Sequence, residues 1–270
     1  MLHEWKNPEI AVSVCIIGLL GETGAASVSD IAKLVATDTL DEVLLELEDR
    51  GYVRTISVDK MRIVDPTVYT LRERGREMYH AMTELNAVEV VDQINVKHAL
   101  DALDIGIRVQ SALGNNAEWY ATSEARGIIN VLSDTIIEKP KQDNGIPKFS
   151  KPPLPDGLIF GEKWTVWVQA LPLLIRAPGI ARIAARYDAV LERVGGFHQV
   201  VWIAQNSVQA RHTRIGVGRI DVKDTLRLRL DNVYTLGNEV GHIVSIAKDP
   251  QSAVKETPLD QDFRMLFNDN

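Results

Sequence analysis

Arginines in the second half of the chain have the side-chain type and the spacing that phosphate binding requires. Two helices expected in this half, over 180–194 and 207–215, each present arginines on one face. These arginines are Arg182, Arg186 and Arg193 on the first helix and Arg211 and Arg214 on the second. A guanidinium group binds phosphate oxygens through a planar fork of donors. The alternative is a solvated helix surface on which the arginines pair with Asp188 and Glu192.

The distribution of charge along the chain is uneven. Residues 151–220 carry 9 Lys/Arg against 4 Asp/Glu, whereas residues 1–80 carry 9 Lys/Arg against 14 Asp/Glu. The chain as a whole has a net charge of −7, which argues against a protein that coats nucleic acid indiscriminately. The positive excess in the second half favours a surface for nucleic acid or an acidic partner.

Other kinds of chemistry find little support in the sequence. It contains no Gly-rich phosphate loop, HExxH, CxxC or Gly-x-Ser-x-Gly motif. The single cysteine, Cys15, excludes an intrachain disulfide and a cysteine-rich zinc site. His98, His198 and His212 have no acidic residue at ligand spacing, so we expect structural or surface roles for them. The sequence predicts no cofactor.

The order of elements in the first 80 residues predicts a winged helix-turn-helix. Helices are expected over 27–36 and 40–50, because Ser27 can cap the first and Leu40, Val43, Leu44 and Leu47 recur at helical spacing in the second. Strands are expected over 52–58 and 61–64, and 69–75 is expected to lead into a further helix. The segments LEDRGYVRTIS and VYTLRERGREM resemble the winged-helix domains of MarR-like regulators.

The second helix of this motif has an acidic outer face, which leaves two interpretations open. Its carboxylates Asp41, Glu42, Glu46 and Asp49 would repel a DNA backbone, so this helix could instead contact a protein partner. If the domain binds DNA, its basic candidates are Lys33, Arg50, Arg54, Lys60 and Arg62. Lys60 and Arg62 fall on the expected wing, where phosphate or minor-groove contacts are typical.

The rest of the chain divides by composition. We expect a helical connector over 81–138, a Pro-rich linker over 139–155, an α/β domain over 156–250 and a polar tail over 251–270. Strands over 156–160, 163–170, 197–204 and 226–230, together with the two arginine-bearing helices, predict a mixed sheet. No signal peptide or membrane-spanning segment is expected, so the expected location is the cytoplasm.

Several short motifs resemble the replication-relaxation family of plasmids and integrative elements. They are the winged helix, KHALDALDI, PDG and ARYDAVL, and they lie roughly between Ser27 and Asn206. This resemblance implies that the second half is a restriction-endonuclease-like domain of the PD-(D/E)xK type, in which two acids hold a metal and a lysine helps to activate water. Asp156 matches the first acid. Gln169 and Leu171 stand where the second acid and the lysine are needed, so the metal site is expected to be vestigial.

The predicted fold class is therefore α/β (α+β), a winged helix-turn-helix followed by a mixed-sheet, nuclease-like domain. The leading hypothesis is a non-enzymatic protein of a mobile element or phage that binds double-stranded DNA, and a homodimer is one oligomeric state that this hypothesis allows. It would act in transcription control, plasmid replication or mobilisation. The alternative is a protein-interaction adaptor that uses the acidic helix, and a metal-dependent nuclease ranks third.

Overall fold

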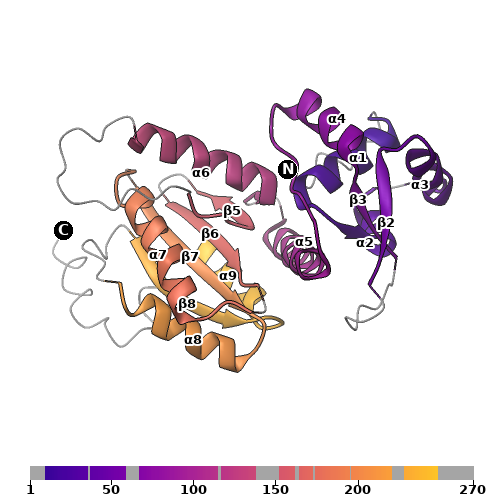
Figure 1. Ribbon diagram of the computed structural model, residues 1–270. Coiled ribbons are helices and arrows are strands. Elements are labelled where there is room, and N and C mark those ends of the chain that lie inside the picture. The colour runs from indigo at the N-terminus through magenta and orange to yellow at the C-terminus, as the bar shows by residue number, and fades with distance from the viewer. Residues whose placement is uncertain are drawn as a thin grey trace.

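A computed structural model describes residues 10–35, 37–58, 67–114, 117–137, 152–161, 164–172, 174–194, 196–220 and 228–248. This part of the chain is a mixed α/β structure with two sheets (Figure 1). None of its helices is both long enough and apolar enough to cross a bilayer.

The first part of the chain builds a three-stranded sheet with helices around it. Its elements are α1 (Val12–Thr23), β1 (Ala26–Ser27), α2 (Val28–Leu34), α3 (Leu40–Asp49), β2 (Val53–Ser57), β3 (Thr67–Leu71) and α4 (Glu73–Thr83). The strand order is β1-β3-β2, and both pairings are antiparallel. Helix, strand, two helices and two strands is an order typical of a winged helix.

Local sequence explains the two helices that precede β2. Ser27 caps α2, because its hydroxyl oxygen accepts a hydrogen bond from the Asp30 amide at 3.1 Å. Leu40, Leu44 and Leu47 are buried on α3, as their spacing predicts. Gly51 adopts a φ of +75°, a conformation that favours glycine, where the chain leaves α3.

The second strand of the antiparallel pair differs from the sequence prediction. The structure places β3 at 67–71, where Ser57 lies opposite Thr67 and Val53 opposite Leu71, and this strand was not predicted. The buried side chains of Val68 and Thr70 alternate with half-buried ones, which is a strand pattern. Helix α4 follows at Glu73, so 69–75 leads into a helix as expected. The predicted strand over 61–64 lies outside the described residues.

The second part of the chain builds a five-stranded sheet. Its elements are α5 (Gln93–Leu113), β4 (Trp119–Ala121), α6 (Thr122–Ile137), β5 (Gly157–Phe160), β6 (Trp164–Ala170), α7 (Ala177–Leu191), β7 (Phe197–Ala204), α8 (Ser207–Val217), β8 (Leu228–Thr235) and α9 (Glu239–Lys248). The strand order is β4-β5-β6-β7-β8. The first two pairings are antiparallel, and β6, β7 and β8 run parallel.

Helices cover both faces of this sheet, as Figure 1 shows. Residues of α6, α7 and α8 share one apolar cluster with Trp167 and Trp202 of the sheet. Residues of α5 and α9 pack on the opposite face with Trp119, Val166 and Val168. Because neighbouring strand residues point to opposite faces, both faces of the central strands are apolar and buried.

The apolar core continues from the first part of the chain into the second. One cluster of buried residues joins α1 and α3 to α5, and through α5 to the five-stranded sheet. Helix α5 packs against α1 and β1 on one side and against α9, β4 and β6 on the other. The segment 81–138 thus supplies α5, β4 and α6 to the second part, while the domain limits themselves stay a prediction.

Two helices of the second part have different bounds from those expected, and one was missed. Helix α7 ends at Leu191, so Arg193 lies beyond it rather than on its face. Helix α8 runs to Val217, past the expected end at residue 215. Helix α9 was not predicted, although its buried Ile243, Ile246 and Ala247 have helical spacing.

Close packing at Gly157 gives a first prediction. A Cβ atom at this position in β5 would overlap the indole ring of buried Trp119 on the neighbouring strand. We expect Gly157→Ala to lower the free energy of unfolding by about 1 to 3 kcal/mol, the usual cost of overpacking. Urea unfolding followed by circular dichroism measures this difference.

Gly241, inside α9, provides the matched control. No heavy atom lies within 4 Å of a Cβ added there, so the same substitution meets open space. Gly241→Ala should raise stability by up to about 1 kcal/mol, because alanine favours helix more than glycine does. Equal effects at the two positions would contradict the packing at Gly157.

Candidate nucleic-acid interface and the buried Asp156 cluster

Helices α7 and α8 bring most of the arginines that were predicted to bind phosphate to one side of the sheet. The two helices pack against each other (Figure 1). Arg182 on α7 and Arg211 and Arg214 on α8 are exposed, and Arg186 is half-buried. Arg214 also donates from Nη2 to the Val233 carbonyl oxygen at 3.2 Å, which anchors its guanidinium group beside β8.

Four of these arginines are seen without a carboxylate at ion-pair distance among the described residues. Within the part of the chain that the structure describes, Arg182, Arg186, Arg211 and Arg214 form no ion pair. Helix α8 contains no acidic residue at all. One interpretation of the sequence was a solvated helix face on which the arginines pair with Asp188 and Glu192. The described contacts of these four arginines do not support it.

Three of the five basic residues predicted for the first part of the chain have partners among the described residues. Lys33 pairs with Asp30 at 3.0 Å, and Arg50 pairs with Glu46 at 2.6 Å. Arg54 donates to the Val90 carbonyl oxygen at 3.4 Å. Lys60 and Arg62 lie outside the described residues.

The outer face of α3 is acidic, as the sequence predicts. Asp41, Glu42, Glu46 and Asp49 are all exposed, and Leu45 between them is 61% exposed. Glu48 is turned toward β2, where its carboxylate accepts hydrogen bonds from the amide and the hydroxyl group of Thr55 at 3.1 Å each. This face gathers the four carboxylates that the sequence suggested for a protein partner.

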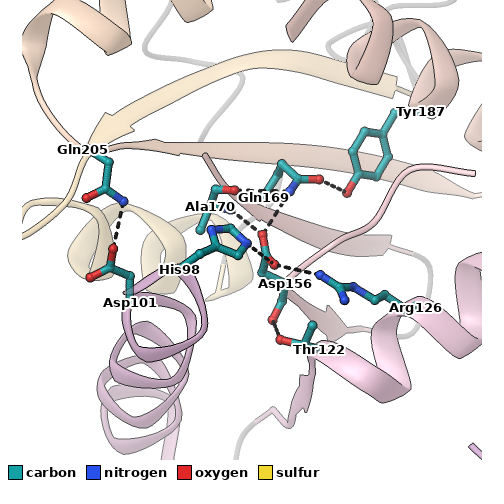
Figure 2. Close-up of polar contacts among 9 residues, drawn as sticks. All are labelled: His98, Asp101, Thr122, Arg126, Asp156, Gln169, Ala170, Tyr187 and Gln205. Atoms are coloured by element: carbon teal, nitrogen blue, oxygen red, sulfur yellow. Dashed lines mark hydrogen bonds and ion pairs between the residues drawn. The ribbon is translucent and has the colours of Figure 1, made fainter. Parts of the chain in front are cut away.

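A second polar cluster is centred on Asp156, which is 2% exposed and comes directly before β5 (Figure 2). Its Oδ1 contacts His98 Nε2 at 2.9 Å and Arg126 Nη2 at 3.5 Å. Its Oδ2 accepts hydrogen bonds from Gln169 Nε2 and from the Ala170 amide, both at 2.9 Å. Three elements meet at this carboxylate, because α5, α6 and β6 carry these donors, and Tyr187 of α7 in turn reaches Gln169.

The structure thus brings together Asp156 and Gln169, the two positions of the expected vestigial metal site. Gln169 uses its amide nitrogen on Asp156 and its amide oxygen to accept from the Tyr187 hydroxyl at 3.2 Å. Burial of Tyr187, reinforced by the nearby charge of Asp156, raises the pKa of its phenol well above the ordinary value. Tyr187 therefore stays neutral and serves as a hydrogen-bond donor.

The residues around Asp156 do not fit a catalytic metal. Both carboxylate oxygens already face donors, and two of those donors, Arg126 and His98, carry or can acquire positive charge. Leu171, which stands at the lysine position of the nuclease motif, is fully buried. No group of three or more His, Cys, Asp or Glu side chains in the described part of the chain could hold a metal ion.

His98 has a partner that the sequence did not reveal. We expected no acidic neighbour because none lies nearby in the chain, but Asp156 reaches it from 58 residues away. The charge of Asp156 raises the pKa of His98 above its ordinary value, although burial of the ring opposes this shift. The interaction fixes α5 to the start of β5.

Two further polar contacts hold α5 against the sheet. Asp101 accepts hydrogen bonds from Lys97 at 2.6 Å and from Gln205 Nε2 at 2.9 Å, and Gln205 lies just beyond the end of β7. Arg108 pairs with Glu239 of α9 at 2.6 Å, and the Glu239 side chain is fully buried. Neither contact could be found from sequence spacing, since more than 100 residues separate the partners.

The His98 interaction gives a pH-dependent prediction. A raised pKa in the folded state means that His98 contributes stability below its ordinary pKa of 6.5, and this contribution is lost as the pH rises through the raised value. Wild type should therefore exceed His98→Gln in free energy of unfolding most strongly below pH 6.5, with the difference shrinking at higher pH. Urea unfolding of both proteins across this range measures it.

His80→Gln is the control, because the exposed His80 ring contacts the Leu85 carbonyl oxygen rather than a carboxylate. Its difference from wild type should not show this decline. A His98→Gln difference that stays constant with pH would contradict the ionic interaction with Asp156.

Comparison with known proteins leaves the family open. No family model matches the chain, and no curated protein matches it. Among solved structures, the chain is similar to Bacillus subtilis PadR in complex with operator DNA, at 17% sequence identity and a TM-score of 0.24. The match covers 54% of this chain and 85% of the PadR chain. A likeness this weak carries no argument about function, and the resemblance to the replication-relaxation family stays a prediction.

Proposed function

We propose that this protein is a non-enzymatic DNA-binding protein that contacts the phosphate backbone through the arginines of α7 and α8. The observation that supports this most directly is the exposure of Arg182, Arg211 and Arg214 without an ion-pair partner in the described part of the chain. An arginine in an ion pair would have to release its carboxylate partner before it could bind phosphate. These three arginines have no such partner to release among the described residues. Contacts of this kind position a protein on DNA without reading its sequence.

The first part of the chain would add a second contact region. Its order of helices and strands is typical of a winged helix, and its wing would carry Lys60 and Arg62. In this proposal α3 does not enter the major groove, because its exposed carboxylates would face phosphates on both sides. The binding mode would therefore differ from that of a helix-turn-helix protein that reads bases with α3.

The biological setting follows from the sequence resemblance alone. The motifs shared with the replication-relaxation family suggest a role in transcription control, plasmid replication or mobilisation, in a mobile element or phage. A homodimer would also suit such a role.

DNA binding should depend on Arg182 and Arg211. Each phosphate contact contributes about 0.9 to the slope of log affinity against log salt, so Arg182→Ala/Arg211→Ala should reduce the slope by about 2. Fluorescence anisotropy with random duplex DNA, in a salt series from about 0.05 to 0.2 M, measures the slope. A Lys60→Ala/Arg62→Ala variant tests the wing in the same assay.

Lys33→Ala/Arg50→Ala is the matched control, since it removes the same number of positive charges from residues that already have carboxylate partners. It should leave the slope almost unchanged. Equal losses in both double variants would show an effect of net charge alone, and absence of salt-sensitive binding by wild type would overturn the proposal.

The absence of catalysis is a separate prediction. The donors around Asp156 and the leucine at position 171 suggest that the chain does not cleave DNA. Incubation of supercoiled plasmid with the protein and Mg²⁺ or Mn²⁺ should give no nicked or linear product. Metal-dependent nicking by wild type that is lost in a folded Asp156→Asn protein would contradict this prediction.

A further inference from the structure

The outward face of α3 is an acidic surface with an apolar centre. Its four exposed carboxylates, Asp41, Glu42, Glu46 and Asp49, surround Leu45, which is 61% exposed. Arg50 offsets part of this charge through its pair with Glu46. A single exposed apolar side chain is ordinary on a protein surface, so the distinguishing feature of this face is the cluster of carboxylates around Leu45.

The outward face of α8 has the opposite charge and a similar apolar content. Val208 is 64% exposed and Ile215 is 42% exposed, and Arg211 lies between them on the same face. Arg214 flanks this row and is also exposed. Because α8 has no acidic residue, nothing within the helix neutralises this face.

The two faces do not meet within one molecule. Helix α3 lies at one end of the structure, and α8 lies on the far side of the five-stranded sheet (Figure 1). Their lengths match, at 10 residues for α3 and 11 for α8. Each face therefore has the charge, the apolar centre and the length that would suit the other face on a different molecule.

We infer that α3 of one chain docks on α8 of a second copy of the same chain. Leu45 packs against Val208 and Ile215, and the carboxylates of α3 pair with Arg211 and Arg214. Exposed ion pairs contribute little one at a time, so the association depends on several of them together and weakens as salt screens them. A two-fold dimer forms this contact twice, once from each α3.

This inference goes beyond the proposed function and does not rest on it. DNA and α3 would compete for the same arginines of α8, so the test is made without DNA. A failure of self-association then leaves the DNA-binding result untouched, and the reverse also holds.

The experiment is sedimentation velocity over a concentration series at low and high salt. Wild type should associate at low salt and become monomeric at high salt. Glu42→Lys/Glu46→Lys makes both faces basic, and Arg211→Glu/Arg214→Glu makes both faces acidic, so each variant alone should be monomeric. An equimolar mixture of the two variants should associate again, because each α3–α8 pair between unlike variants has opposite charges.

The mixture separates this contact from other causes. Circular dichroism confirms that each variant is folded, and a folded pair that stays monomeric when mixed overturns the inference. Wild type that is monomeric at low salt also overturns it, and α3 would then need a different basic partner. Association that persists in either variant alone places the interface elsewhere and has the same consequence.

Discussion

The second part of the structure depends on the burial of the Asp156 carboxylate. A buried charge is tolerated only where donors replace the water that it has lost, and the removal of one partner from such a group costs about 3 to 5 kcal/mol. Here the replacement comes from His98, Arg126, Gln169 and the adjacent Ala170 amide, which lie on three different elements. The same carboxylate that sequence resemblance assigns to a metal joins helices to a sheet here, through donors that face both of its oxygens.

Charge is separated in space as well as along the chain. The exposed carboxylates of α3 and the exposed arginines of α7 and α8 lie at different ends of the structure. Local pairs reduce the charge of the first part, through Asp30 with Lys33 and Glu46 with Arg50, but nothing comparable is seen among the described contacts of Arg211 and Arg214. The protein therefore presents two surfaces of opposite sign despite a modest net charge, and a partner would be selected by which surface it meets.

Much of the secondary structure was predictable from the sequence, because it depends on local patterns. The apolar spacing in α3, the β-branched residues of β6 and the buried run of β7 all occur where expected. The order of elements after the Pro-rich segment also matches. The elements that were not predicted include β3 at 67–71 and α9.

The site was less predictable, because its contacts join residues that are distant in sequence. The pairing of Asp156 with Gln169 was anticipated only through a family motif, and His98 was assigned no partner. Hydrogen bonds such as those of Gln205 and Glu239 with α5 depend on how strands are ordered in the sheet, and spacing contains no information about that order. The arginines on α7 and α8 could be found from the sequence because helical spacing is a local property. The absence of ion pairs from the described contacts of four of them could not be found in this way.

The continuous core through α5 has a consequence for the cooperativity of unfolding. Buried residues of α1 and α3 and those of the five-stranded sheet belong to the same apolar cluster, with Leu103, Ile105 and Val109 of α5 between them. Separation of the first 80 residues would expose this shared surface on both fragments. The two parts should therefore unfold in one transition rather than two. A change that destabilises one part should then also reduce the folded population of the other part.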